Sequence, residues 1–227
     1  MLAGRARKAH AALALLGTLI GGATLLAQFL LTLHLAQAGG YSFVGSIVFF
    51  FSFFTILTNI LVFLCFASEF LPGSGRISGF FRESAVRSAV AVYITVVALV
   101  YIFILQHLWD PQGLSKFLDR LLHYVMPALY LLFWLFFVPK GQARWMQALQ
   151  WLVYPVAYGV YVMTRGAVTG LYPYPILDAG RFGYAIAFRN LGLIFLLFLG
   201  IGFLIVAVDR SLGRSRNLAF SDGGRGA

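Results

Sequence analysis

The chain has 227 residues, of which 61% are hydrophobic and only 11% are charged. A soluble domain of this length could not cover so much apolar surface, so the composition excludes a soluble fold and predicts an integral membrane protein. The net charge of +10 does not indicate nucleic acid, because the basic residues lie at the ends of apolar runs and in the tails, where they suit membrane lipids. A single cysteine, Cys65, excludes an internal disulfide and predicts a packing residue.

Six apolar runs follow one another, each about as long as a helix needs to cross a bilayer. They cover about Ala11–Ala36, Phe43–Ala67, Ala85–Gln106, Phe117–Val138, Ala148–Arg165 and Phe182–Val208. The predicted fold is all-α, a polytopic membrane protein with six transmembrane helices in one bundle over residues 11–208. A basic N-terminus, residues 1–10, precedes the bundle. A basic tail, residues 209–227, follows it, and its Ser, Gly and Arg content predicts disorder from Ser211 onward.

The basic residues indicate how the bundle is oriented. Twelve Lys and Arg residues fall in the N-terminus, the second and fourth loops and the C-terminal tail, against four in the odd-numbered loops, with Arg189 inside the last span. Because cytoplasmic loops carry the excess of positive charge, both termini are predicted to be cytoplasmic. Within the first span, Gly17 and Gly21 form a GxxxG pattern, which favours a close helix contact.

Polar residues interrupt the second run in the stretch FFFSFFTILTNILVF. On one continuous helix, Ser52, Thr55 and Asn59 share a face, with Thr58 beside it. Such a stripe is expected to face the bundle interior, because an amide that faces lipid is costly. The alternative is that these hydroxyls bond to carbonyls of their own helix and that Asn59 ties two helices together.

Two further polar groups approach the same level of the membrane. With cytoplasmic termini, His123 lies about six residues into the fourth span, and Arg189 about seven residues into the sixth, next to Asn190. A guanidinium at that depth needs a partner, such as Asp178 or the carboxylate of a ligand, unless it extends to the interface. His34 and His107, near the outer ends of their helices, are weaker candidates.

A proline-rich segment, Tyr172-Pro173-Tyr174-Pro175, follows Arg165 on the outer side. Two prolines at this spacing prevent a regular helix, and tyrosines suit the membrane interface. The segment is predicted to form a rigid lid, or else a simple interfacial turn.

The motifs of common hydrolases and nucleotide-binding proteins are absent from the sequence, and the isolated histidines predict no metal site or cofactor. The catalytic pattern that remains is a threonine hydroxyl whose proton is taken by an imidazole. Thr55 or Thr58 would be the nucleophile and His123 the base, while Asn59 or Arg189 would stabilise an oxyanion.

The order of these motifs resembles the bacterial Pr-six-Pr family of six-helix membrane proteins. The motifs are FFTILTN from Phe53, LHYVMP from Leu122, YPVAY from Tyr154, Arg165-Gly166, and YPYPILD from Tyr172. The series is more distantly similar to the eukaryotic androgen-induced family, which includes the androgen-dependent regulator of tissue factor pathway inhibitor. The resemblance implies a location in the bacterial inner membrane. It also implies an intramembrane threonine hydrolase that cleaves fatty acid esters of hydroxy fatty acids.

Carried onto this chain, the resemblance makes Thr55 the nucleophile and His123 the base, with Thr58 as the rival nucleophile. Asn59, Arg189, Arg165, Tyr172 and Tyr174 are the expected oxyanion or substrate-binding residues, and the expected partner is a lipid or amphiphilic ester. A second hypothesis is a membrane protein that binds or transports an amphiphile without chemistry. A third is an assembly protein whose polar groups only lock helices together. The oligomeric state stays open.

Overall fold

The computed structural model describes residues 2–71, 75–108 and 110–223, and over these ranges it contains helices and no strand. The α-helices are α1 (Leu2–Ala38), α2 (Phe43–Phe51), α3 (Phe54–Ala67), α4 (Arg76–Arg82), α5 (Ser84–Phe103), α6 (Gly113–Arg120), α7 (Met126–Phe137), α8 (Trp145–Gln150), α9 (Val153–Thr169), α10 (Ala179–Phe182) and α11 (Tyr184–Gly223). Two 3₁₀ turns, η1 (Leu105–His107) and η3 (Pro175–Leu177), and a π-helical turn, η2 (Leu121–Val125), complete the set.

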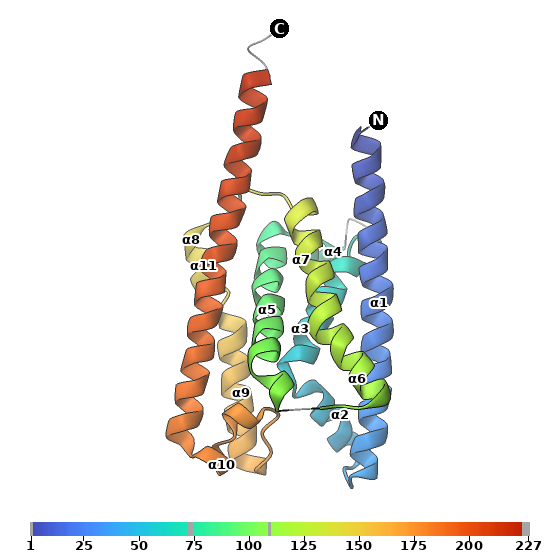
Figure 1. Ribbon diagram of the computed structural model, residues 1–227, viewed down its shortest axis with the longest axis vertical. Coiled ribbons are helices and arrows are strands. Elements are labelled where there is room, and N and C mark those ends of the chain that lie inside the picture. Colours follow the sequence, from blue (N-terminus) through green and yellow to red (C-terminus); the bar gives the residue numbers. More distant parts are fainter. Residues whose placement is uncertain (1, 72–74, 109, 224–227) are drawn as a thin grey trace.

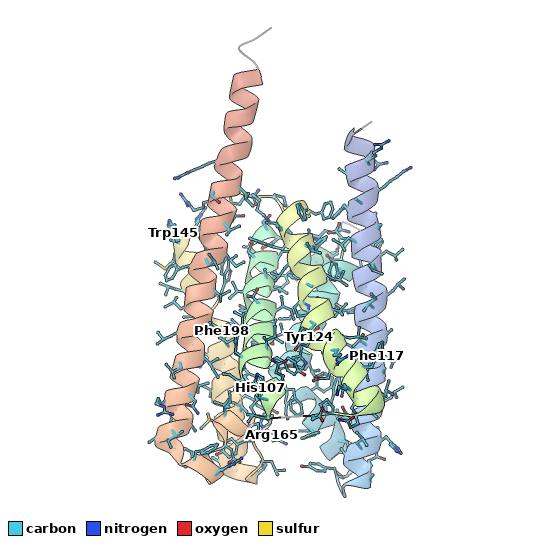
Figure 2. All side chains as sticks on the ribbon, in the orientation of Figure 1. His107, Phe117, Tyr124, Trp145, Arg165 and Phe198 are labelled. Atoms are coloured by element: carbon cyan, nitrogen blue, oxygen red, sulfur yellow. The ribbon has the colours of Figure 1, made fainter. Side chains whose placement is uncertain are left out.

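The long helices run side by side along one axis, and both termini lie at the same end of the bundle (Figure 1). We call this the terminal end; α4 and α8 lie toward it, whereas α2 and α10 lie toward the opposite end (Figure 1). Figure 2 shows Trp145 of α8 toward the terminal end and Arg165 of α9 toward the opposite end.

Within the part of the chain that the structure describes, four helices are long and apolar enough to cross a membrane, and the bent pair of α2 and α3 makes a fifth if it counts as one span. The four are Gly4–Ala38, Ser84–His107, Gly113–Phe137 and Tyr184–Arg214. Large apolar side chains are exposed on the outside of the bundle, including Leu19 at 62% and Phe103 at 73%, and Phe117 projects outward in the same way (Figure 2). Such a surface is typical of helices that face lipid.

The predicted second span is not one helix. It breaks after α2 at Ser52 and Phe53, and α3 continues at an angle of 73°. The prediction that Ser52, Thr55 and Asn59 share one face of a continuous helix is therefore wrong. Thr55 and Asn59 share α3, while Ser52 belongs to the break.

The predicted fifth span is also divided. Its first residues form α8, and Trp151 and Leu152 separate this short helix from α9. The Tyr93 hydroxyl of α5 donates to the carbonyl of Trp151 at 2.8 Å and satisfies one backbone group at this break. The 17 residues of α9 extend about 26 Å at 1.5 Å per residue, which is at the lower limit for a membrane span.

The first span packs through its small residues, as the GxxxG pattern predicted. A Cβ atom on Gly17 would lie 2.5 Å from the Phe66 ring of α3, and one on Gly21 would lie 2.8 Å from Met126 of α7. These glycines therefore let α1 approach both neighbours closely. Cys65, on the same part of α3, is fully buried, in line with its predicted packing role.

Both ends of the chain are more helical than expected. The first helix begins at Leu2 rather than near Ala11, and α11 continues through the predicted disordered tail as far as Gly223. Each helix extends beyond its apolar span, because arginine, lysine, alanine and leucine favour helix even where no apolar face has to be buried. The end of the predicted tail, residues 224–227, lies outside the described residues.

At the terminal end, a buried carboxylate fastens a loop to α11. Asp209 Oδ2 accepts the backbone N–H groups of Gly141 and Ala143 at 2.9 and 2.8 Å. The connection between α7 and α8 is thereby held against α11. At the contact, Gly141 and Gly213 meet backbone to backbone, and a Cβ atom on Gly213 would lie only 2.4 Å from the Gly141 Cα.

Candidate functional site

The structure brings a threonine and a histidine together in the interior of the bundle. Thr55 Oγ1 lies 3.3 Å from His123 Nε2, and the two residues are only 7% and 9% exposed. Thr55 is the second residue of α3, and His123 lies in the π turn between α6 and α7. The pair that the sequence suggested as nucleophile and base is therefore within hydrogen-bonding reach.

Pro127 explains why the chain forms a π turn at His123. Proline has no N–H to donate to the carbonyl four residues earlier, which here is that of His123, and its ring crowds that carbonyl. The turn widens, and the N–H of Met126 bonds to the carbonyl of Leu121, five residues back. Single π turns of this kind are frequent at functional sites.

The other imidazole nitrogen shows which tautomer His123 adopts. Nδ1 lies 2.9 Å from the Asp119 carbonyl oxygen and 3.1 Å from Asp119 Oδ1. Both partners are acceptors, so Nδ1 carries the proton and donates it, and Nε2 presents a lone pair to the Thr55 hydroxyl. This is the arrangement in which an imidazole accepts a proton from a nucleophile.

Tyr101 of α5 fixes this unit in place. Its hydroxyl donates to Asp119 Oδ2, and its ring stacks on His123 with centroids 3.9 Å apart. The carboxylate therefore has a partner on each oxygen, and the imidazole is held against a flat aromatic face. Threonine, histidine and aspartate thus form a chain of contacts like that of a hydrolase triad.

Asn59 clamps the two elements that carry the pair. Its side-chain nitrogen donates to the carbonyl of Thr55 at 2.9 Å and to that of Leu122 at 3.3 Å. Both N–H donors are thereby committed to backbone carbonyls, so the oxyanion role expected of Asn59 is not supported. The side chain instead holds α3 at a fixed distance from the π turn.

Thr58, the rival nucleophile, has no base beside it. Its hydroxyl is buried, and its described polar neighbour is the hydroxyl of Tyr154 rather than His123. A threonine hydroxyl needs a base to become a useful nucleophile. The geometry therefore favours Thr55.

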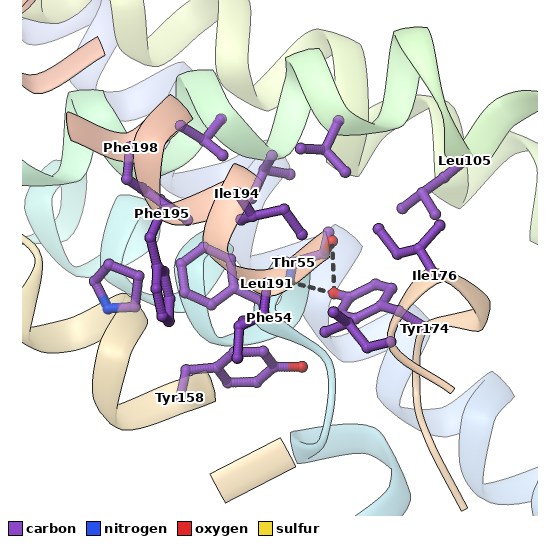
Figure 3. Close-up of a pocket in the computed structure, with 15 residues that line it drawn as sticks. Phe54, Thr55, Leu105, Tyr158, Tyr174, Ile176, Leu191, Ile194, Phe195 and Phe198 are labelled. Carbon is purple, nitrogen blue, oxygen red and sulfur yellow. Dashed lines mark hydrogen bonds between the residues drawn. The ribbon is translucent and has the colours of Figure 1, made fainter. Parts of the chain in front are cut away.

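The break before α3 gives Thr55 a second feature, a set of backbone N–H groups without intrahelical partners. The N–H of Thr55 donates to the hydroxyl of Tyr174 at 3.2 Å, and the same hydroxyl lies 3.4 Å from Thr55 Oγ1 (Figure 3). Burial raises the pKa of Tyr174 above its ordinary value, so the phenol keeps its proton and remains a donor. An amide and a phenol thus meet beside the hydroxyl, at the positive end of a helix.

Two tyrosines of α9 contact Ser52 at the break between α2 and α3. The Tyr158 hydroxyl donates to the carbonyl of Ser52 at 2.8 Å, and the Tyr161 hydroxyl lies 3.0 Å from Ser52 Oγ. The groups that a continuous helix would have satisfied internally are therefore satisfied across the bundle. Tyr158, the last residue of the YPVAY motif, therefore has a structural role at the break before α3.

The proline-rich segment lies over the opposite end of α9, and only one of its tyrosines reaches Thr55. Tyr174 does so, whereas Tyr172 packs its ring directly on Gly166. Arg165 donates to the carbonyl of Leu171 at 2.6 Å, and Asn190 donates to that of Ile176 at 2.8 Å. Arg165 and Tyr172 therefore anchor the segment and do not line the Thr55 site.

Other predicted polar residues lie away from the site. Arg189 is exposed, and its described hydrogen bond is to the neighbouring Asn190 at 3.3 Å, so no described contact supports the expected oxyanion or carboxylate role. Asp178 does not pair with Arg189; its carboxylate caps α10 by accepting the N–H of Arg181. His34 and His107 are exposed.

An apolar pocket of about 60 Å³ reaches Thr55 from the side of α5, α9 and α11 (Figure 3). Thr55, Tyr158 and Tyr174 contribute its hydroxyl groups. The remaining lining is apolar: Phe54, Val96, Val97, Val100, Leu105, Pro155, Ile176, Leu177, Leu191, Ile194, Phe195 and Phe198. A molecule in this pocket would meet the Thr55 hydroxyl, the phenol of Tyr174 and hydrocarbon.

Sequence reasoning missed Asp119, Tyr101 and Tyr158. A local signal existed for Asp119, because it lies four residues before His123 and residues at that spacing share a helix face. No local signal identifies Tyr101 or Tyr158, because both act on residues that are distant in the sequence.

Comparisons of the chain with protein-family models, with curated proteins and with solved structures found no match. These comparisons therefore assign no role to any of the residues described above. Among the described residues, no group of three His, Cys, Asp or Glu side chains could hold a metal ion.

Proposed function

We propose that this chain is an integral-membrane hydrolase of lipid or similar amphiphilic esters, in which Thr55 is the nucleophile and His123 its base. One observation carries the proposal. Thr55 Oγ1 lies 3.3 Å from a nitrogen of His123 whose partner nitrogen has its proton tied to Asp119. An imidazole oriented in this way is ready to take the hydroxyl proton.

The reaction proceeds in two halves. Thr55 Oγ1 attacks the ester carbonyl while His123 Nε2 takes its proton. The tetrahedral intermediate then collapses, the alcohol leaves with that proton, and an acyl-threonine ester remains. Water, deprotonated by His123, attacks this ester and releases the carboxylic acid, and the proton returns to Thr55.

Two donors are available for the oxyanion. The Thr55 N–H and the Tyr174 hydroxyl now bond to each other, and a carbonyl oxygen that enters between them would take a hydrogen bond from each. One well-placed donor is worth roughly 3 kcal/mol of transition-state stabilisation. We therefore assign Tyr174 to the oxyanion and Asn59 to positioning.

We further propose that the chain crosses the membrane six times with both termini in the cytoplasm. In this proposal the bent α2–α3 pair is one crossing and α9 another. Val153, Val160 and Val168 lie exposed along α9, which fits contact with lipid. The excess of Lys and Arg in segments near the terminal end supports the orientation. The resemblance to the bacterial Pr-six-Pr family supports an inner-membrane location, and that to the androgen-induced family supports the threonine hydrolase activity.

The test is ester hydrolysis by purified protein in detergent. Thr55→Val removes the hydroxyl at nearly constant shape and is expected to lower kcat/KM at least about 1,000-fold, while Thr55→Ser keeps measurable turnover. His123→Gln is expected to cost about 10²- to 10⁴-fold. Covalent labelling by a fluorophosphonate provides a second readout that depends on the same nucleophile.

Thr58→Val is the matched control, because it makes the same change three residues further along the same helix. It is expected to retain activity and labelling, with folding checked by thermal melting of every variant. Loss of activity in Thr58→Val but not in Thr55→Val would reassign the nucleophile. Binding of an amphiphile that survives Thr55→Val, with no hydrolysis by the wild type, would favour the binding or transport hypothesis.

A further inference from the structure

The pocket beside Thr55 has walls that carry no charge. Its polar groups are the hydroxyls of Thr55, Tyr158 and Tyr174, and the Tyr158 hydroxyl already donates to the carbonyl of Ser52. The two arginines considered for substrate binding do not line the pocket: Arg165 donates to the carbonyl of Leu171, and Arg189 donates to the side chain of Asn190. Burying a carboxylate or an ammonium group in such a pocket would be costly, because nothing there could pair with it.

The two ends of this pocket differ. At one end, Pro155, Tyr158 and Phe198 are buried, and at the other Leu105 and Ile176 are only partly buried. In Figure 3, Phe195 and Phe198 lie to one side of Thr55, while Leu105, Ile176 and Tyr174 lie to the other. The pocket therefore has a more closed end at Pro155, Tyr158 and Phe198, where Phe195 is partly buried beside them, and a more accessible end at Leu105 and Ile176.

This asymmetry indicates how an ester would lie across Thr55. The alcohol must depart after the first half of the reaction, whereas the acyl group stays attached to the threonine until water arrives. The departing group suits the accessible end, and the retained acyl group suits the closed end. The closed end then limits the size of the acyl group.

The pocket is small. A cavity of about 150 Å³ accepts benzene, which corresponds to about 25 Å³ for each carbon atom. On that scale, the pocket volume of about 60 Å³ holds about two to three carbons. A long acyl chain would have to displace the aromatic side chains at the closed end.

Building on the proposed function, we infer that this hydrolase selects esters whose acyl group is short and uncharged, and that Phe195 sets the length limit. Phe195 of α11 packs against α9 at Gly159, where Leu191 of α11 also lies close. A Cβ atom on Gly159 would lie 2.8 Å from Phe195 Cζ. Truncating Phe195 extends the pocket toward Gly159, because no side chain of α9 occupies that space.

The experiment compares p-nitrophenyl acetate, butyrate and octanoate on purified wild type and Phe195→Ala. The wild type is expected to prefer the acetate or butyrate to the octanoate by at least about tenfold in kcat/KM, since one misfitting methylene is worth about that much. Phe195→Ala is expected to shift the octanoate-to-acetate ratio upward by about tenfold. Phe188→Ala, the same change at a 54% exposed residue of the same helix, is expected to leave the ratio unchanged.

Two further arms strengthen the test. The mono-p-nitrophenyl ester of succinic acid has the same number of acyl carbons as the butyrate but ends in a carboxylate, so the wild type is expected to cleave it at least about tenfold more slowly. Val97→Phe fills the pocket from α5 and is expected to lower the butyrate-to-acetate ratio. This variant tests the inference even if Phe195→Ala does not fold.

The outcomes separate the two proposals. If the wild type cleaves all three esters through Thr55 but neither Phe195→Ala nor Val97→Phe changes the chain-length ratio, the acyl-pocket inference is overturned and the hydrolase proposal stands. A wild type that prefers the octanoate or accepts the succinyl ester equally well overturns it too. If no ester is cleaved in a Thr55-dependent manner, the proposed function fails, and the inference fails with it.

Discussion

Thr55 differs from other hydroxyl residues of the bundle in what its side chain contacts. Thr18, Thr95 and Ser46 donate to carbonyls four residues earlier in the chain, as hydroxyls in membrane helices commonly do. Thr55 is the second residue of its helix, and its hydroxyl contacts His123 and Tyr174, on two other segments of the chain. The break before α3 thus turns an ordinary helix hydroxyl into a reactive candidate.

At the residue scale, Asp119 is predicted to position His123. Asp119→Asn removes the charged acceptor of the Nδ1 proton but keeps the Asp119 carbonyl, which accepts the same proton at 2.9 Å. We therefore expect kcat for ester hydrolysis to fall by about 10- to 100-fold, with KM nearly unchanged. The preference of His123 for the Nδ1-protonated tautomer becomes weaker, but it is not reversed.

The control for this effect is Tyr101→Phe, which keeps the ring that stacks on His123 and removes the hydroxyl bound to Asp119. It is expected to lower kcat less than Asp119→Asn does, and Asp119→Glu is expected to restore part of the rate. Equal activity of Asp119→Asn and wild type, in folded protein, would contradict the positioning role.

At the element scale, two irregular helices build the site. The chain breaks between α2 and α3, and it widens into a π turn between α6 and α7. The first irregularity exposes backbone donors beside Thr55, and the second places His123 Nε2 toward α3. Regular helices at both places would rotate these side chains by about 100° for each residue of slip and would separate the pair.

The packing of α1 on this region gives a stability prediction. Gly17→Ala puts a methyl group 2.5 Å from the Phe66 ring, so either the ring or α1 must move. We expect the free energy of unfolding to fall by about 1–3 kcal/mol, the usual cost of overpacking, measured by thermal or denaturant unfolding in detergent.

Gly192→Ala is the matched control on α11. A Cβ atom there meets nothing within 4 Å, and alanine favours helix over glycine by about 1 kcal/mol. This variant should be neutral or slightly more stable than the wild type. A Gly17→Ala protein as stable as the Gly192→Ala protein would show that α1 does not pack tightly on Phe66.

At the scale of the whole molecule, the charge distribution predicts a topology that labelling can test. Because Cys65 is fully buried, cysteines placed at exposed positions report with little background. Gln37, near the opposite end of α1, and Gln142, in the loop that Asp209 fastens to α11, are both exposed. We expect a membrane-impermeant maleimide to label Gln37→Cys in intact cells and Gln142→Cys only after the membrane is opened.

A reversed pattern would place the termini outside the cytoplasm. Labelling of both positions from one side would mean an even number of crossings between them. The spans from α2 to α7 make three crossings if the bent pair counts as one. This result would therefore exclude the α2–α3 pair as a full span.

The sequence by itself determined that the chain forms apolar membrane helices, because length and hydropathy are local properties that no tertiary contact changes. It also singled out Thr55 and His123, since a polar side chain inside the membrane costs free energy unless it has a partner, and such residues are commonly functional. Only the tertiary structure decided how they meet. The break at Ser52 is satisfied by Tyr158, and the imidazole is held by Tyr101, both from distant parts of the chain. Arg189 is a further example, because its side chain lies away from Thr55 and His123, and no residue near it in the sequence indicates this.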